Sequence, residues 1–131
     1  MNIVHISAEC YPYAKAGGLG DVVGALPKYL NQSGHNCMVI LPYYHNNKLT
    51  EAKKTQVFEG QAPFHNDWFY FRVFKIEENK EFDLYVVDIP GRFDRPGVYI
   101  DPWSGHAYWD EEERFFSFQI AALDWLKNFD F

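Results

Sequence analysis

Cysteine is scarce in this sequence, which also lacks histidine clusters, lysine or arginine runs, and long apolar segments. Its 131 residues contain two cysteines, Cys10 and Cys37, at or near expected strands, where free cysteine commonly serves as a small buried apolar residue. We therefore expect structural thiols, not a disulfide or a catalytic cysteine. The five histidines show no metal-ligand spacing with one another or with cysteine, so no metal site is indicated.

The charge balance and the hydropathy argue against several classes of partner. The formal net charge is -6, which disfavours a nucleic-acid surface and binding to an anionic membrane. No apolar run reaches the roughly 18 residues that a membrane span needs, and the first residues contain no basic targeting segment. These two observations predict a soluble, cytoplasmic protein. With 47% hydrophobic and 19% aromatic residues, the sequence predicts one folded domain.

The first third of the chain predicts a strand, a helix and a second strand. Residues 3–8 and 36–44 are apolar and β-branched, as is typical of buried strands in a parallel sheet. Between them, apolar residues recur at helical spacing from Gly18 to Ser33, which predicts a helix with one buried stripe. That stripe comprises Leu19, Val22, Val23, Leu26 and Leu30. This order of elements is the βαβ unit of a parallel sheet.

The aromatic second part of the chain predicts two more strands and a loop. Residues 68–76 and 82–89 predict a hairpin, or an antiparallel strand followed by a return into the sheet. A loop follows over residues 90–105. Within it, the sequence Asp94-Arg95-Pro96-Gly97 predicts a type II turn with proline and glycine at its centre.

A second helix is predicted over residues 110–127. Asp110 fits the N-cap of this helix, and Glu113 fits its capping-box partner three residues later. The predicted apolar stripe comprises Phe115, Phe116, Ile120, Leu123 and Leu126. The chain ends with NFDF directly after this helix, which suggests a piece of a longer protein.

The stretch KAGGLGD, residues 15–21, leaves the first strand and opens the first helix. A turn in this position lies at the carboxyl edge of the sheet, where open α/β folds bind ligands. Free amides at the helix start, and glycines that allow close approach, suit the oxygens of a sugar phosphate. Lys15 would add a positive charge, and Asp21 would accept hydrogen bonds from sugar hydroxyls. A ligand with both sugar and phosphate groups fits this turn best.

Residues 15–21 also have interpretations other than this one. The order of residues excludes a Walker A loop, because Lys15 precedes the glycines. A dinucleotide-binding fingerprint is weak, because Gly24 comes one place late and no acidic residue follows the second strand. The glycines fit equally well a strand-to-helix turn that needs positive φ. Asp21 equally fits an acidic residue in the first turn of a helix, where the helix dipole favours negative charge. Glu9 is either a site carboxylate or a polar loop residue, and Lys15 fits an exposed, solvated lysine equally.

Residues 5–30, HISAECYPYAKAGGLGDVVGALPKYL, closely resemble the amino terminus of bacterial glycogen synthases and plant starch synthases. That family carries a K-x-G-G-L-[GA]-D signature near its start. Further matches follow in the same order, namely LPY at 41–43, FDRPG at 93–97, RF at 114–115 and AAL at 121–123. The likeness covers nearly the whole chain. It departs from the family at residues 110–115, where DEEERF replaces D-N-x-x-R-F, so any role of that asparagine is absent.

The resemblance implies an α/β fold, a Rossmann-like parallel-sheet domain with a β-hairpin insertion, which is the amino-terminal half-domain of a GT-B glycosyltransferase. Residues 1–131 would form this acceptor-side domain, truncated at its carboxyl end. The implied reaction transfers glucose from ADP-glucose to the non-reducing end of an α-1,4-glucan with retained configuration, and it requires no metal. The sequence leaves UDP-glucose open as the donor.

The resemblance also implies roles for residues of the glycine-rich turn. In the family, the lysine that matches Lys15 contacts the sugar nucleotide, and the loop that matches Gly17 and Gly18 lies against its phosphate and glucose. Lys15 is therefore the expected catalytic residue, because a fixed cation stabilises charge on the leaving diphosphate. Asp21 and Glu9 are expected to contact sugar or to order the loop.

The family's remaining catalytic residues match no position of this chain, so the 131 residues alone should be inactive. The resemblance implies a carboxyl-terminal donor domain in cis. The alternative is a non-catalytic relative that binds a glucan or a partner protein.

Overall fold

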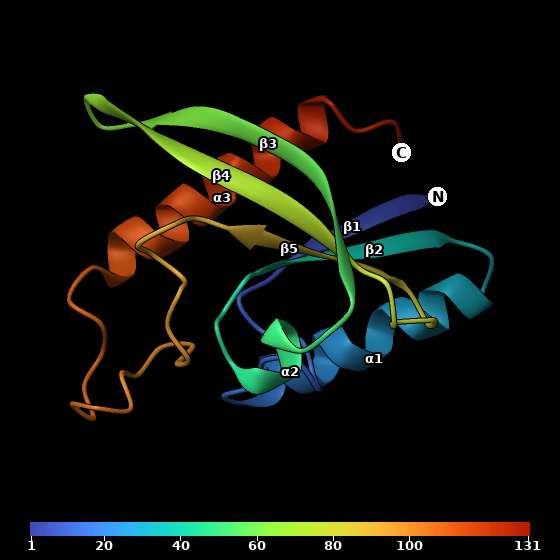
Figure 1. Cartoon of the computed structure of the whole chain (residues 1–131). Coiled ribbons are helices and arrows are strands. Elements are labelled where there is room, and N and C mark those ends of the chain that lie inside the picture. The colour runs from blue at the N-terminus through green and yellow to red at the C-terminus, as the bar shows by residue number, and fades with distance from the viewer.

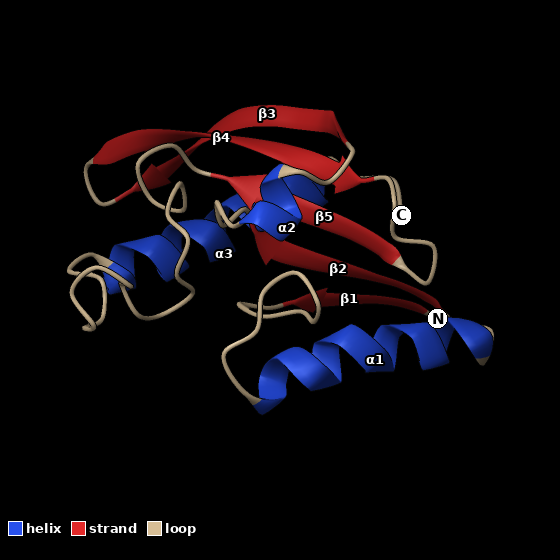
Figure 2. Ribbon diagram, turned by 60° about the horizontal axis from the view of Figure 1, so that its bottom comes forward, coloured by secondary structure: helices blue, strands red, loops and turns tan.

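The structure is a computed structural model that describes all residues from 1 to 131. Its five strands are β1 (Asn2–Ile6), β2 (Asn36–Pro42), β3 (Lys54–Phe64), β4 (Asp67–Ile76) and β5 (Asp83–Asp88). Its helices are α1 (Gly18–Gln32), α2 (Asn47–Thr50) and α3 (Glu111–Lys127). The strands form one sheet in the order β1-β2-β5-β4-β3, with α3 on one side and α1 and α2 on the other (Figures 1 and 2).

The predicted βαβ unit is confirmed. β1 and β2 pair in parallel and are joined by α1, and β5 continues the parallel part beside β2. β2 is buried from Cys37 to Pro42 because it has a strand on each side and helices on both faces. β1 is only half-buried, since it lies at the edge of the sheet, so the prediction of a buried first strand is wrong. Cys10 and Cys37 are buried free thiols, as predicted.

Helix α1 has the predicted length but a different buried face. Most of the predicted stripe is exposed, including Leu19, Val22 and Leu26. The residues buried in the helix are Gly20, Val23 and Pro27. Small residues on this face allow close approach, and a Cβ atom on Gly24 would lie 2.6 Å from the carbonyl oxygen of Tyr11. Short-range contact with the loop after β1 therefore sets the orientation of α1, whereas hydrophobicity alone predicts a neighbouring face that shares only Val23 with the buried one.

The aromatic segments form strands as predicted, in the second of the two arrangements. β4 pairs antiparallel with β5, and β5 returns into the parallel part of the sheet beside β2. β3 and the short helix α2 are absent from the sequence-based prediction. β3 pairs antiparallel with β4 over its whole length and is largely exposed, since it is the other edge of the sheet. Its inward-facing residues alternate as Phe58, Gly60, Ala62 and Phe64.

Helix α3 begins where predicted, but the local chemistry at its start differs. Asp110 occupies the N-cap position without accepting a hydrogen bond from the helix, so the predicted capping box with Glu113 is wrong. The Asp110 carboxylate is instead buried against two arginines. The predicted stripe is also wrong in part, because Phe116 and Leu123 are exposed. The face that α3 buries comprises Arg114, Ser117, Phe118, Ala121, Ala122 and Trp125.

The predicted type II turn is wrong as well. Only Gly34, Gly91 and Gly105 have positive φ among the glycines, whereas a type II turn centred on Pro96 and Gly97 needs positive φ at Gly97. A Cβ atom on Gly97 would lie 2.1 Å from the carbonyl oxygen of Ile100 and 2.7 Å from the Tyr108 hydroxyl. Glycine is thus required there by a close approach of backbone and side chain, and not by its φ angle.

The three parallel strands all end at the same edge of the sheet. The loops that follow them cover residues 7–17, 43–46 and 89–110, and they gather on one side of the molecule (Figure 1). This edge is where parallel α/β sheets place their ligands. None of the helices is long and apolar enough to span a bilayer.

Candidate functional site

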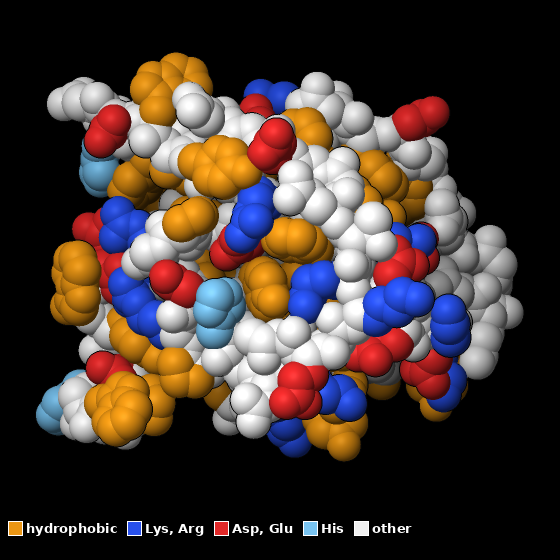
Figure 3. Space-filling view, viewed as in Figure 1, with side chains coloured by type: hydrophobic (Ala, Val, Ile, Leu, Met, Phe, Trp, Pro, Cys, Tyr) orange, Lys and Arg blue, Asp and Glu red, His pale blue; other side chains and the backbone are white.

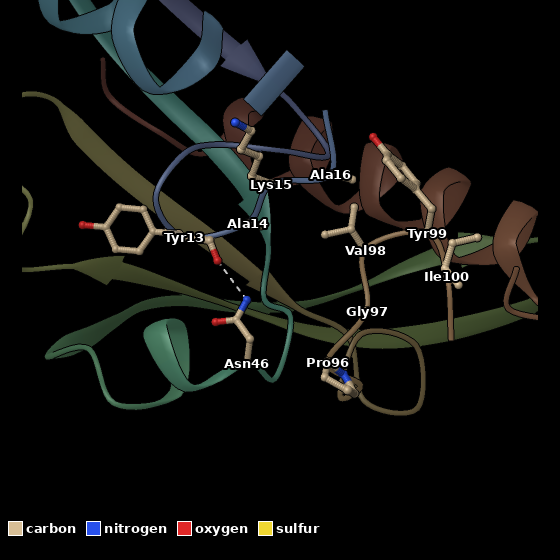
Figure 4. Close-up of a pocket in the computed structure, with 10 residues that line it drawn as sticks. All are labelled: Tyr13, Ala14, Lys15, Ala16, Asn46, Pro96, Gly97, Val98, Tyr99 and Ile100. Carbon is tan, nitrogen blue, oxygen red and sulfur yellow. Dashed lines mark hydrogen bonds between the residues drawn. The ribbon is translucent and has the colours of Figure 1, made fainter. Parts of the chain in front are cut away.

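A pocket of about 300 Å³ lies where the three loops meet. The first loop contributes Tyr13 to Ala16, the second contributes Asn46, and the third contributes Pro96 to Ile100. Figure 4 shows these three segments facing one another, with the Lys15 side chain extending to the opposite side of its loop from Asn46. The structure therefore places the predicted lysine at the predicted edge of the sheet.

Glu9 orders the glycine-rich loop. Its Oε1 atom accepts hydrogen bonds from the amides of Ala16 at 2.7 Å and Gly17 at 2.9 Å. Its Oε2 atom accepts one from the Tyr99 hydroxyl at 2.7 Å, and Glu9 is only 4% exposed. These four residues are called the Glu9 clamp below. The clamp joins the first loop to the third across 90 positions of the chain.

The electrostatics of the clamp favour an ionised carboxylate. Burial alone would raise the pKa of Glu9, but hydrogen bonds from the Tyr99 hydroxyl and from the Ala16 and Gly17 amides outweigh it and hold that pKa below its usual value. Burial, together with the bond to Glu9, raises the pKa of Tyr99. Tyr99 therefore stays a donor and Glu9 stays an acceptor.

The second loop, residues 43–46, also donates hydrogen bonds to the backbone of the first loop, residues 7–17. The Tyr44 hydroxyl donates to the carbonyl oxygen of Ala8 at 2.7 Å, and the side-chain amide of Asn46 donates to that of Tyr13 at 2.8 Å. Asn46 also caps α2, because its side chain accepts from the Leu49 amide at 2.9 Å. The backbone around Lys15 is thus tied to both neighbouring loops.

The third loop is held by the start of α3. Arg114 is fully buried and donates to three backbone carbonyl oxygens, those of Arg92 at 2.9 Å, Val98 at 3.0 Å and Gly97 at 3.2 Å. The centre of its guanidinium lies 4.2 Å from the centroid of the Tyr108 ring. Because Arg114 has three backbone acceptors and no carboxylate partner, it acts as a fixed support for the segment that carries Tyr99.

A buried ion cluster completes this support. The Asp110 carboxylate is fully buried and accepts from Arg92 at 3.0 Å and from the second terminal nitrogen of Arg95 at 2.9 Å. Burial alone would raise the pKa of Asp110, but the hydrogen bonds from the two arginines outweigh it and lower that pKa. The cluster stays charged and keeps the third loop against α3.

Lys15 and Asp21 form an ion pair at the glycine-rich turn. Lys15 Nζ lies 2.9 Å from Asp21 Oδ1, and both side chains are about half exposed. Lys15 is one of the residues that line the pocket, and its ammonium group lies beside Asp21 at the first turn of α1. A pair with this exposure is held weakly, about 1 kcal/mol at most, so an anion that reaches the ammonium group can replace Asp21.

Gly17 and Gly18 have open space where a side chain would lie. A Cβ atom on either residue would meet nothing within 4 Å, and neither has positive φ. The interpretation as a strained turn is therefore wrong for these two glycines. The amides of Gly18 and Leu19 donate to no group in the chain, as is usual at a helix start. Room and free donors thus coincide beside Lys15.

The residues predicted from the sequence lie together, and others join them. Lys15, Gly17, Gly18, Asp21 and Glu9 all belong to the first loop and the start of α1. Tyr99, Asn46 and Arg114 complete the site but were not predicted. Arg114 lies in a stretch that matches the family, whereas no spacing rule connects Tyr99 to Glu9. No group of three histidine, cysteine or acidic side chains in the chain is placed to hold a metal ion.

Comparisons with known proteins agree with one another. A family model described as the starch synthase catalytic domain matches residues 2–131. The glycogen synthase of Flavobacterium johnsoniae is 47% identical to this chain over 131 residues, and that of Streptococcus agalactiae serotype Ia is 38% identical over 135 residues. The two alignments cover 96% and 100% of this chain, and 25% and 26% of the two relatives.

A solved structure shares the fold. The catalytic domain of Starch Synthase IV from Arabidopsis thaliana, bound to ADP and acarbose, matches with a TM-score of 0.83 and 27% identity. The match covers 97% of this chain and 25% of that one. These findings confirm the predicted resemblance and fold class. The chain spans about a quarter of the length of the relatives it matches.

Proposed function

Because the chain belongs to the starch synthase catalytic domain family, we propose that it forms the acceptor-side part of a glucosyltransferase that uses ADP-glucose. The enzyme transfers glucose to the 4-hydroxyl group at the non-reducing end of an α-1,4-glucan, with retained configuration. The glycogen synthases among its relatives, and the ADP in the Arabidopsis structure, support this choice of donor and product.

One observation carries the proposal: Lys15, the open space at Gly17 and Gly18, and the unpaired amides at the start of α1 lie together beside the pocket. When the bond between C1 of glucose and the diphosphate breaks, negative charge builds on the leaving phosphate. A lysine ammonium and fixed amides stabilise that charge most in the transition state. Lys15 is the catalytic residue in this scheme, and Gly17 and Gly18 lie against the phosphate.

Asp21 and Glu9 have different roles in the same scheme. Asp21 is exposed and holds the Lys15 ammonium until the diphosphate replaces it; its carboxylate is then free to accept a bond from a sugar hydroxyl. Both carboxylate oxygens of Glu9 are engaged within the chain, so Glu9 acts by ordering the loop. We thus assign Glu9 a positioning role in substrate binding.

The reaction also needs protein outside these residues. The relatives are about four times as long as the part matched here, and the pocket is open to solvent. We propose that residues 1–131 belong to an amino-terminal, acceptor-side domain, and that a donor domain in the same polypeptide closes over Lys15 and binds the base of the nucleotide.

Lys15→Ala in the complete natural polypeptide tests the proposal. We expect turnover with labelled ADP-glucose and glycogen to fall about 100- to 1000-fold, the loss typical of removing one charge-stabilising group. The melting temperature should not change, since the Lys15 pair is half exposed. Lys28→Ala is the matched control, because Lys28 also forms an exposed ion pair, with Glu81 at 3.2 Å, but lies away from the pocket.

Three results would decide against parts of the proposal. Turnover of Lys15→Ala equal to that of the unmodified protein rejects the role of Lys15. Faster transfer from UDP-glucose than from ADP-glucose rejects the donor. Glycogen binding without transfer from either donor identifies a non-catalytic relative.

A further inference from the structure

Two tryptophans in the loop between β5 and α3 are almost completely exposed. Trp103 is 92% exposed and Trp109 is 85% exposed, the two highest values among the large hydrophobic residues. Figure 3 shows hydrophobic side chains gathered over this loop, at the lower left, beside acidic and basic ones. An exposed indole leaves a large apolar surface in water, so two of them on one loop point to a binding surface.

The loop that carries Trp103 is ordered. Ile100 and Ala107 form an antiparallel bridge, and the Asp101 amide donates to the His106 carbonyl oxygen at 2.8 Å. The Trp103 amide donates to the Asp101 carboxylate at 2.9 Å. Trp103 is therefore displayed at the end of a small hairpin.

Trp109 is fixed from the other side. It lies between Tyr108, which is buried against Arg114, and Asp110, which is bound by Arg92 and Arg95. The backbone positions of both indoles are thus set before any ligand arrives, which lowers the entropic cost of binding.

Trp103 and Trp109 share a pocket of about 330 Å³ with Asp94, Arg95, Pro96, Asp101 and Tyr108. We call these residues the tryptophan surface. Asp94 forms no ion pair, and Asp101 bonds only to backbone, so both carboxylates can accept hydrogen bonds from hydroxyl groups. Pro96 also lines the Lys15 pocket, so the two pockets lie on either side of one chain segment.

We propose that the tryptophan surface is a second binding site for the α-1,4-glucan, which holds the acceptor chain at a distance from its reacting end. This inference rests on the proposed function, because it takes the glucan as the acceptor. A glucose ring has an apolar face of C–H groups, which stacks on the negative face of an indole, and a rim of hydroxyls, which bond to carboxylates. The tryptophan surface offers both groups within one pocket.

Other ligands fit this surface less well. Arg95 also lines this pocket, but its guanidinium is already paired with the buried Asp110, so the unpaired carboxylates of Asp94 and Asp101 would repel a phosphate group or a nucleic acid. Acidic residues are depleted at the centre of protein interfaces, whereas here they lie beside the indoles. A neutral ligand with many hydroxyl groups avoids both penalties.

Native gel electrophoresis of the complete natural polypeptide in gels with and without glycogen tests the proposal. We expect glycogen to retard the unmodified protein, and the variant Trp103→Ala/Trp109→Ala to show an apparent affinity about tenfold weaker, from the loss of two stacking contacts. Trp68→Ala is the matched control, because Trp68 is also an exposed tryptophan but lies on β4. Its retardation should not change.

Turnover separates this inference from the proposed function. In the double variant, KM for glycogen should rise about tenfold, while kcat with a short acceptor such as maltotriose stays unchanged. Equal retardation of the double variant and the unmodified protein, or no retardation of the unmodified protein, overturns the inference. Loss of turnover with maltotriose in the double variant also overturns it, since the indoles would then support the catalytic pocket. Absence of transfer with normal retardation rejects the proposed function and leaves the glucan surface standing.

Discussion

Tyr99→Phe tests whether the Glu9 clamp orders the loop that carries Lys15. The substitution removes one hydroxyl, which lies 2.7 Å from Glu9 Oε2, and leaves the ring in place. A hydrogen bond to a charged group contributes about 1.5 to 3 kcal/mol, and a buried acceptor that loses its donor is not readily resolvated. Glu9 keeps its two amide donors, so we expect the low end of this range, about 1.5 kcal/mol.

Hydrogen exchange in the complete polypeptide measures this effect locally. The amides of Ala16 and Gly17 donate to Glu9, so they exchange only when the clamp opens. A loss of about 1.5 kcal/mol corresponds to exchange about tenfold faster at these two amides. Because the loop positions Lys15, kcat/KM should fall by a similar factor. Tyr29→Phe is the control, since Tyr29 is exposed on α1.

The same variant should shift the acid sensitivity of the loop. The pKa of Glu9 is depressed, so its contribution to stability is present above its ordinary pKa and is lost as the pH falls through the depressed value. Removing the Tyr99 hydroxyl raises that pKa, so the loop should lose its order at a higher pH than in the unmodified protein. Unchanged exchange at Ala16 and Gly17, at neutral pH and in acid, would refute the reasoning.

Two further predictions concern residues that support the site. Gly24→Ala places a Cβ atom 2.6 Å from the Tyr11 carbonyl oxygen, so it should lower the free energy of unfolding by about 1 to 3 kcal/mol, measured by thermal melting. The Cβ atom of Gly17→Ala meets no atom within 4 Å, so this variant should lower only kcat/KM. Equal melting temperatures for the two variants would contradict this. Asp110→Asn removes the carboxylate that pairs with Arg95 and should destabilise the protein by about 3 kcal/mol; a melting curve that matches that of the unmodified protein would exclude a stabilising role for the cluster.

The sheet was predictable where burial leaves a clear pattern. The run from Cys37 to Pro42 is apolar without interruption because β2 is covered on both faces, and such a run predicts a parallel strand. β3 gives a weaker signal, since an edge strand needs apolar residues on one face only. Its alternation of Phe58, Gly60, Ala62 and Phe64 was present but includes a glycine, which weakens the pattern.

The orientation of α1 was not predictable from hydrophobicity. A helical stripe predicts which residues gather on one face, but it does not say which face the chain turns toward the sheet. Here the contact is set by how closely Gly20 and Gly24 approach the loop after β1, with Lys15 and Tyr11 as the nearest neighbours. Leu19, Val22 and Leu26 therefore form an exposed apolar face, although their spacing is regular.

The position of the candidate site in the fold was predictable, whereas the contacts that order its loop were not. A lysine and glycines after the first strand of a βαβ unit lie at the carboxyl edge of the sheet by topology alone. The order of the loop depends on bonds across 90 positions, from Tyr99 to Glu9, and on the three carbonyl oxygens that Arg114 holds. Contacts between residues so far apart in the chain produce no regular spacing that a sequence pattern could reveal.

These supports form one continuous chain of contacts from α3 to the glycine-rich loop. Arg114 fixes the carbonyl oxygens of Gly97 and Val98, Tyr99 follows directly along the backbone, and its hydroxyl fixes Glu9. Each link is buried or partly buried, so solvent does not readily replace it. The segment that Arg114 holds also separates the Lys15 pocket from the tryptophan surface. Residues 94–96 line the tryptophan surface and residues 96–100 line the Lys15 pocket, so the same supports fix one wall of each.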